Sequence, residues 1–383
     1  MSSPFTPFLG TVPKAFVGRE KQIECFKISL DDAKHNKPSS ILLIGQRGIG
    51  KTVLLKYFSG IARESQFCPV YLPLDESSST PATLAKRIFG RVKAVLEDEF
   101  TALKAKKFVK QIDPKLSLKL QDIELQISSS LRAEEILEDN FSMSLGRLLN
   151  KRQVCVFTDE TQSVLGNGMA RFIVNTLYSE LPDHASNWVF VLAGVPVLEE
   201  KILKATPADR AFQKMELSAL TSHEVTTILQ NTAKDTKVRF RKDACELIAQ
   251  DTHGMPYYVQ FFGDKLFNLI EAGTISTDFY TQKKRLVFEE LSQTVFGTRI
   301  KDLERRGLYA DVLLQFAFMD RQEGVGVSEL LNKIPTYPGP YIRELETKGF
   351  IVRTARGKYR VTDGLFKEWL CKTYKPKKNK RAK

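Results

Sequence analysis

Residues 41–52 read Ile-Leu-Leu-Ile-Gly-Gln-Arg-Gly-Ile-Gly-Lys-Thr, and these residue types at this spacing fit phosphate chemistry. Four apolar residues suited to a buried strand run directly into the pattern Gly-x4-Gly-Lys-Thr. The glycines let the backbone curl so that its N–H groups point at phosphate oxygens, and the helix that follows adds its positive N-terminal dipole. The residues expected to bind the nucleotide are Gly45, Gln46, Arg47, Gly48, Ile49, Gly50, Lys51 and Thr52.

Two side chains of this loop have specific expected roles. Lys51 would neutralise the β- and γ-phosphates, and the Thr52 hydroxyl would hold Mg²⁺. Since the guanine-selecting pattern Asn-Lys-x-Asp occurs nowhere in the sequence, ATP is favoured over GTP. The alternative is a chance glycine turn between a strand and a helix.

A second apolar run, Val154 to Phe157, leads through Thr158 to two carboxylates. Beside the phosphate loop, Asp159 would reach Mg²⁺ through its water shell, and Glu160 would polarise a water for in-line attack on the γ-phosphate. The alternative is that Asp159 and Glu160 cap the next helix as a solvated pair.

The segment Phe16-Val17-Gly18-Arg19-Glu20 ahead of the loop resembles the lead-in of AAA+ and STAND-related ATPases. The similarity is greatest to origin-recognition-type initiator ATPases, archaeal winged-helix ATPases and the ATPases that regulate transposition, and it extends to uncharacterised bacterial ATP-binding proteins. It covers residues 4–370 in organisation. The resemblance implies that Val17 and Gly18 pack beside the adenine; read alone, they fit equally a loop with a short apolar anchor.

The same resemblance gives expectations for three further positions. Many members carry a polar residue that senses the γ-phosphate at the end of the strand read here at 188–194, but Ala193 and Gly194 occupy that end. Arg210 stands where the family places a catalytic arginine finger, which acts in the nucleotide site of a neighbouring subunit. The alternative is that Arg210 forms a surface ion pair with an acid such as Asp209. Tyr257 stands where a lid arginine usually contacts the nucleotide.

Length and composition fit a globular protein of two or three domains, with 383 residues of which 42% are hydrophobic. No apolar run approaches the roughly 20 residues that span a bilayer, and the N-terminus lacks the layout of a signal peptide. The five cysteines show no CxxC spacing and the four histidines no metal-ligand spacing. These features predict a cytoplasmic protein with reduced cysteines.

Strands alternate with helices through residue 217, which predicts an α/β fold: a three-layer P-loop core over 1–217 with a parallel sheet. The pattern then turns helical, which predicts a lid over 218–300 and a linker at 296–306. Inside the core, alternating apolar residues predict an inserted hairpin at about 115–128. That hairpin would pack on its flanking helices or contact DNA or a neighbouring subunit.

Residues 305–371 have the element order of a winged-helix domain. The expected elements are helices at 308–318, 327–334 and 340–348, strands at 350–354 and 358–362, and a closing segment at 365–370. A basic tail at 372–383 follows.

Positive charge is concentrated at this end. Residues 305–383 hold 18 Lys and Arg against 8 Asp and Glu, so most of the net charge of +13 lies there. A cationic surface releases counterions on meeting a polyanion, which favours double-stranded DNA as a partner. The candidate DNA contacts are Tyr341, Arg343, Arg353, Arg356, Lys358 and Arg360. Winged helices also dock proteins, and basic tails can be merely solubilising.

These features together predict an ATP-hydrolysing AAA+-like switch that associates with DNA and assembles subunit to subunit when ATP is bound. The alternative is a STAND-like signalling ATPase whose winged helix packs on its own nucleotide domain and whose partner is a protein.

Overall fold

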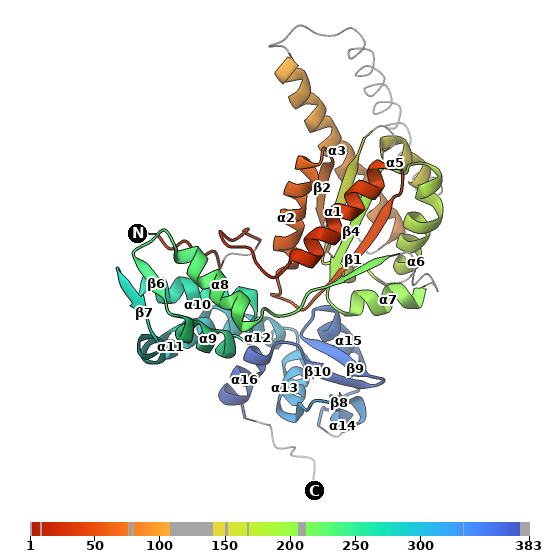
Figure 1. Cartoon of the computed structure of the whole chain (residues 1–383). Coiled ribbons are helices and arrows are strands. Elements are labelled where there is room, and N and C mark those ends of the chain that lie inside the picture. The colour runs from red at the N-terminus through yellow and green to blue at the C-terminus, as the bar shows by residue number, and fades with distance from the viewer. Residues whose placement is uncertain are drawn as a thin grey trace.

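The computed structural model describes residues 2–7, 10–75, 77, 80–107, 141–149, 152–166, 168–205, 212–331 and 333–375, with the side chains of 99–107 and 205 left out. A five-stranded parallel sheet forms its centre (Figure 1). The strands are β1 (Ser39–Ile44), β2 (Cys68–Pro73), β3 (Val154–Asp159), β4 (Trp188–Gly194) and β5 (Gln213–Glu216), in the spatial order β2-β3-β4-β1-β5.

The strand order places β4 between the phosphate-loop strand β1 and the carboxylate strand β3. Val191 of β4 is in register with both Ile41 and Phe157. Local apolar runs identify strands without showing which strands pair, because pairing depends on contacts that are distant in sequence. The carboxyl end of β4 therefore lies between the phosphate loop and the carboxylates.

Helices cover both faces of the sheet, which confirms the three-layer α/β prediction. Successive residues of β1 alternate between faces: Ile41 and Leu43 belong to one apolar cluster, Leu42 and Ile44 to the other. The first cluster includes residues of α1 (Glu20–Lys34) and α2 (Lys51–Glu64). The second includes residues of α3 (Pro81–Lys107), α5 (Phe141–Leu149), α6 (Met169–Val174) and α7 (Val197–Ala205). Short helical turns η3 (Thr161–Ser163), η4 (Asn175–Glu180) and η5 (Leu181–Asp183) complete the core.

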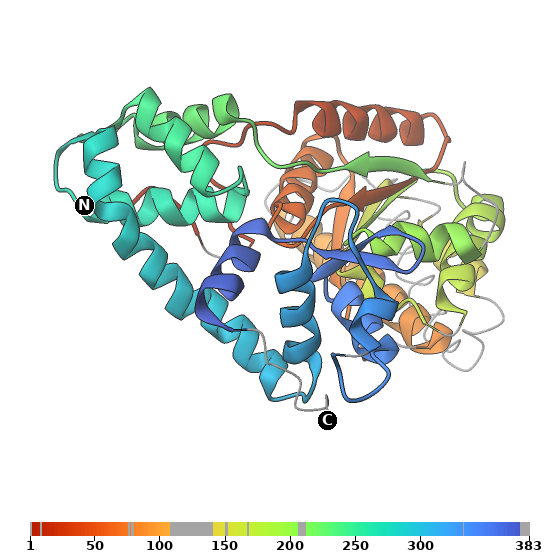
Figure 2. The same cartoon turned by 90° about the horizontal axis from the view of Figure 1, so that it is seen from below.

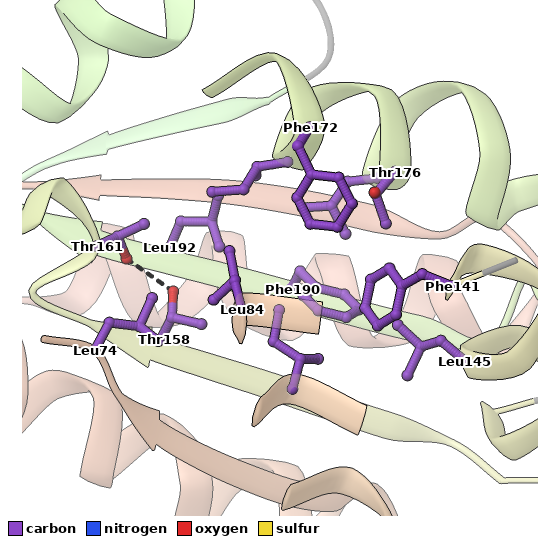
Figure 3. A pocket seen from close by; sticks show the side chains of 13 residues that line it. Leu74, Leu84, Phe141, Leu145, Thr158, Thr161, Phe172, Thr176, Phe190 and Leu192 are labelled. Atoms are coloured by element: carbon purple, nitrogen blue, oxygen red, sulfur yellow. Dashed lines mark hydrogen bonds between the residues drawn. The ribbon is translucent and has the colours of Figure 1, made fainter. Parts of the chain in front are cut away.

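A cavity of about 20 Å³ lies within the second cluster (Figure 3). Phe141, Phe172 and Phe190 line it together with aliphatic side chains, and at one end Thr158 is hydrogen-bonded to Thr161 over 2.8 Å. A space of this size is near that of a single water, so it is a packing defect of the core and not a nucleotide site.

Helix α3 extends past the sheet (Figure 1). The proposed hairpin at 115–128 and Arg210 lie outside the described residues.

The region predicted as the lid consists mainly of helices, with a two-stranded parallel sheet that the sequence pattern did not predict. Its elements are α8 (Ser222–Ala233), β6 (Val238–Phe240), α9 (Lys242–Asp251), α10 (Pro256–Asn268), β7 (Gly273–Ile275), α11 (Thr277–Leu291), η6 (Ser292–Phe296) and α12 (Gly297–Glu304). Thr221 and Glu224 form a reciprocal capping box at the start of α8.

The expected linker at 296–306 is wrong for most of its length. Helical structure continues from α11 through η6 to the end of α12 at Glu304. Phe296, Ile300 and Leu303 recur at helical spacing and are buried, so packing outweighs the weak helix preference of Gly297. Continuous helix therefore connects the lid to the C-terminal segment.

The C-terminal segment, defined here as residues 309–373, contains a three-stranded antiparallel sheet in the order β8-β10-β9. Its elements are α13 (Tyr309–Met319), β8 (Val325–Gly326), α14 (Val327–Leu331), α15 (Gly339–Thr347), β9 (Ile351–Ala355), β10 (Lys358–Val361) and α16 (Gly364–Thr373). The three predicted helices, the hairpin and the closing segment are all present, and β8 is an addition.

Figures 1 and 2 show the C-terminal segment, in blue, against both the core and the lid. Among the described residues, no helix is long and apolar enough to cross a membrane. All five cysteines lie within the described residues, and none of them forms a disulfide there.

Candidate nucleotide site

The phosphate loop joins β1 to α2 in a conformation that needs its glycines. Gly48 and Gly50 have φ values of 84° and 98°, which side-chain-bearing residues rarely adopt. Lys51, the first residue of α2, is buried, and its ammonium donates to the carbonyls of Gly45 (2.8 Å) and Gln46 (3.1 Å). Burial lowers the pKa of Lys51, while the nearby Glu160 and Asp159 oppose that shift. The cation is thus held within the loop where phosphates would bind.

Asp159, at the end of β3, accepts hydrogen bonds from three groups in different parts of the chain. Its Oδ2 accepts hydrogen bonds from the Thr52 hydroxyl (2.6 Å) and the Tyr71 hydroxyl (2.9 Å), and its Oδ1 accepts from the backbone N–H of Glu160 (3.0 Å). Burial and the adjacent Asp159 raise the pKa of Tyr71, so its phenol remains a donor. The Thr52 and Asp159 oxygens form the kind of hard donor pair that Mg²⁺ prefers.

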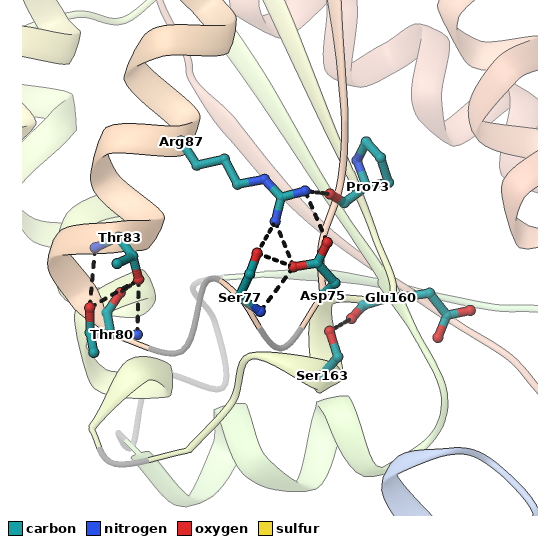
Figure 4. Close-up of polar contacts among 8 residues, drawn as sticks. All are labelled: Pro73, Asp75, Ser77, Thr80, Thr83, Arg87, Glu160 and Ser163. Atoms are coloured by element: carbon teal, nitrogen blue, oxygen red, sulfur yellow. Dashed lines mark hydrogen bonds and ion pairs between the residues drawn. The ribbon is translucent and has the colours of Figure 1, made fainter.

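The loop after β2 is fixed by Arg87 of α3 (Figure 4). Its guanidinium donates to the Pro73 carbonyl (3.0 Å) and to Asp75 (2.9 Å), which also accepts from the Ser77 backbone (3.0 Å). Hydrogen bonds from Arg87 and Ser77 lower the pKa of Asp75 to about 2. These contacts connect the carboxyl end of β2, the strand that carries Tyr71, to α3.

The lead-in segment lies against the phosphate loop and α2. Phe16 stacks on Tyr57 of α2 with ring centroids 4.6 Å apart. Both Phe16 and Val17 line a cavity between the core and the lid, which we call the main cavity. The buried Arg19 donates to the carbonyls of Ile49 and Ser218, each at 3.1 Å. Burial lowers the pKa of Arg19, although Glu224 and Glu20 lie near enough to oppose the shift. Arg19 therefore joins the lead-in, the phosphate loop and the connection to the lid.

The N-terminal segment also reaches this cavity. Phe5 is buried against the lid, edge-on to Phe240 and Phe267, and the Thr6 backbone donates to the Gln260 side chain (3.0 Å).

The main cavity measures about 410 Å³ and opens between the core and the lid. Such a volume is ordinary for a small-molecule site. Its lining includes Gly10, Arg47, Lys51, Thr52, Asp159, Glu160 and Tyr257. Tyr257, near the start of α10, is among these lining residues, and burial raises the pKa of its phenol.

Glu160 follows β3 in the left-handed region with φ of 55°. Its carboxylate accepts from the Gln162 side chain (2.5 Å), and its backbone carbonyl accepts from the Ser163 hydroxyl (2.7 Å; Figure 4). At the end of β4, Ala193 and Gly194 supply no polar side chain.

The C-terminal segment contacts the core directly beside this site. The Arg47 guanidinium of the phosphate loop lies 5.9 Å from the centre of the Phe350 ring. Arg353 of β9 forms a 2.5 Å ion pair with Glu200 of α7, and Lys201 lies 3.5 Å from the Thr347 hydroxyl.

The C-terminal segment also contacts the lid. Asp363 accepts from Arg299 (2.9 Å) and from the Tyr258 hydroxyl, and His253 lies 3.1 Å from Glu368. Burial by itself lowers the pKa of Arg299. The nearby Tyr258 and Asp363 outweigh this effect, so the pKa of Arg299 is raised overall.

The predicted DNA contacts fall into two groups. Arg343, Arg356 and Arg360 are exposed, whereas Lys358 is half-buried. Tyr341 packs edge-on against Tyr309 at 4.9 Å, and Arg353 is occupied by Glu200. The three exposed arginines are therefore the members that a ligand could reach in this arrangement.

Comparison with known proteins identifies the core. Residues 15–193 match the AAA ATPase domain family. This confirms the predicted family resemblance, and the protein is an ATP hydrolase.

Two solved structures have a fold similar to that of this ATPase. The Walker-type ATPase PABY2304 of Pyrococcus abyssi has a TM-score of 0.57 and 18% identity, over 93% of this chain and 96% of that one. The ORC2 protein of Aeropyrum pernix in its ADP form has a TM-score of 0.50 and 15% identity, over 95% and 98%. At these identities the likeness is one of fold. No curated protein sequence matches the chain significantly.

Sequence reasoning missed three residues of the ATPase site. Tyr71 follows an ordinary strand pattern, and nothing local indicates that its hydroxyl meets Asp159. The sequence pattern includes Arg19 only as part of the lead-in segment. Its position just before α1 is the one local signal of a structural role. Gln162 follows the carboxylate pair by two residues, and that proximity was the one available signal.

Proposed function

We propose that the protein is an ATP-dependent, DNA-associated switch that assembles with further copies of itself when ATP is bound. The observation that carries the nucleotide part is the meeting of the phosphate loop, Thr52, Asp159 and Glu160 at one cavity. In this proposal Lys51 binds the β- and γ-phosphates and Glu160 polarises the attacking water. Val17 and Gly18 contact the adenine side of the nucleotide, and Arg210 acts on a neighbouring subunit.

Magnesium is part of the proposal because the oxygen donors fit it. The Thr52 hydroxyl and the Asp159 carboxylate, 2.6 Å apart, would hold the ion, with phosphate oxygens and waters as further ligands. Bound there, Mg²⁺ would neutralise charge that develops on the phosphates. Three or more His, Cys, Asp or Glu residues grouped as a metal site occur nowhere in the described parts of the chain.

The DNA part of the proposal rests on charge. We assign the core to 1–217, the lid to 218–300, a winged helix to 305–371 and a basic tail to 372–383. Arg343, Arg356 and Arg360 are exposed. Basic residues outnumber acidic ones at this end of the chain, so it would attract the phosphate backbone of DNA.

A salt titration with duplex DNA tests this part. The affinity should fall with salt at a slope of roughly −0.9 per phosphate neutralised. Replacing Arg343, Arg356 and Arg360 by Ala should flatten that slope by up to about 3 units without changing ATP binding. The matched control replaces Arg63, Arg241 and Arg285, which are exposed arginines of the core and lid, by Ala. If both triple variants change the slope equally, DNA binding is not localised to the C-terminal segment.

A second candidate function has an observation of its own. The C-terminal segment is docked on the nucleotide domain through Phe350 near Arg47 and through the pair Arg353–Glu200. That docking favours a STAND-like signalling ATPase with a protein partner. Absence of duplex binding near physiological salt, in the presence and absence of ATP, would make this the better proposal.

A further inference from the structure

Strand β4 ends between the phosphate loop and the carboxylates, so a polar side chain at its end could act on the reacting groups. The backbone N–H of Gly45 donates to the Gly194 carbonyl over 3.1 Å, which places the end of β4 directly beside the phosphate loop. However, Ala193 is buried and Gly194 has no side chain. The strand itself therefore contributes nothing that could orient Glu160 or a water.

The carboxamide of Gln162 fills that place. Gln162 belongs to η3, directly after the carboxylate pair, and only 2% of the residue is exposed. A Cβ atom added to Gly194 would lie 2.5 Å from Gln162 Oε1, so the amide rests on the backbone of β4 where a side chain would otherwise project. The glycine is thus what allows Gln162 to occupy the end of the strand.

The orientation of the amide follows from its partners. The backbone N–H of Val195 can only donate, and it contacts Gln162 Oε1 at 3.2 Å. The amide NH₂ must therefore face the other way, and it donates to Glu160 Oε2 at 2.5 Å. An amide nitrogen carries two hydrogens, and this hydrogen bond uses one of them.

We propose that Gln162 is the positioning residue for Glu160 and supplies the polar group that strand β4 lacks. The inference rests on the proposed role of Glu160 in activating the attacking water. Glu160 is exposed and sits on a left-handed residue after the strand, so its side chain needs an external contact to hold one direction. Gln162 provides that contact from a buried, hydrogen-bonded position.

Steady-state ATP hydrolysis by Gln162→Ala and Gln162→Glu tests the proposal. Both should lower kcat about 10- to 100-fold, the usual effect of removing a supporting hydrogen bond, with little change in KM for ATP. Gln162→Glu keeps the shape and can still accept from Val195, but its ionised carboxylate cannot donate to Glu160. Ser163→Ala is the matched control, because the Ser163 hydroxyl donates to the backbone carbonyl of Glu160 and not to its carboxylate; its kcat should change less than about twofold.

The split between kcat and KM separates positioning from packing. A residue that only orients Glu160 acts on the chemical step, so kcat should fall while KM for ATP stays within about twofold of wild type. A purely structural Gln162 would give wild-type kcat in Gln162→Glu at pH 8, or a loss in KM alone, and either result overturns the proposal.

Two controls keep the outcome interpretable. If Gln162→Ala fails to fold, as judged by circular dichroism, Gln162→Glu alone decides the question because it retains the acceptor for Val195. Glu160→Gln is measured in parallel. Full turnover by Glu160→Gln would refute the base role itself, whereas an inactive Glu160→Gln beside a fully active Gln162→Glu would refute only the role of Gln162.

Discussion

Replacing Glu346 by Gln is expected to stabilise the protein above pH 7 by strengthening the contact between the C-terminal segment and the core. Glu346 is half-buried near the end of α15. Burial and the nearby Glu200 raise its pKa from an ordinary 4.5 to about 7, although Arg353, Lys201 and Lys204 pull it down. The ionised carboxylate is therefore unfavourable where it lies.

The size and sign of the effect follow from linkage. A change from 4.5 to about 7 corresponds to about 3 kcal/mol, and solvent screening of this partly exposed group reduces it to about 1–2 kcal/mol. Because the folded state holds the proton more tightly, the free energy of unfolding falls as pH rises from 4.5 to 7. The penalty is complete above pH 7 and absent below about pH 4.5.

Urea unfolding of wild type and Glu346→Gln at pH 5 and pH 8 measures this difference. The variant should be more stable by about 1–2 kcal/mol at pH 8 and nearly equal to wild type at pH 5. Glu246→Gln serves as control, because Glu246 is part of a surface pair with Lys242 and should change stability by less than about 0.5 kcal/mol at either pH. Equal stability of wild type and Glu346→Gln at pH 8 would refute the reasoning.

Four further outcomes are expected. Calorimetry should show that Lys51→Ala loses most ATP binding, whereas Glu160→Gln keeps ATP bound and fails to hydrolyse it; equal loss of binding in both would contradict the role of Glu160. If Arg210 acts in trans, turnover per subunit should rise with protein concentration, and mixing Arg210→Ala with Glu160→Gln should restore part of the activity. Asp363→Ala should destabilise the protein by about 3 kcal/mol in urea unfolding, since it leaves a largely buried arginine without its carboxylate. Arg19→Ala should reduce stability by about 2 kcal/mol and weaken ATP binding, because two backbone carbonyls lose their donor; unchanged binding would limit Arg19 to a structural role.

The nucleotide chemistry was readable from sequence because its signals are local. A phosphate loop needs glycines with positive φ next to a strand and a helix, and residues 45–52 display all of these within one short stretch. The carboxylates that follow an apolar run were identified in the same way. The helices and hairpin of the C-terminal segment were also predicted from short patterns, each within a few residues of the observed bounds.

The errors and omissions arose where distant segments meet. The linker expected around Gly297 is helix, because Phe296, Ile300 and Leu303 are buried by partners that the local sequence does not show. The separation of β1 and β3 by β4 is likewise a matter of pairing between segments more than 100 residues apart.

The sequence by itself therefore determined that this chain binds and hydrolyses ATP, since phosphate recognition is encoded in backbone geometry over a few consecutive residues. Only the tertiary structure decided what surrounds the nucleotide: Tyr71 on Asp159, Gln162 on Glu160, and the C-terminal segment beside Arg47. The physical reason is that the local sequence around each of these groups is compatible with many backbone conformations. A single arrangement is selected when burial makes unpaired polar groups and open apolar surface unfavourable across the whole molecule.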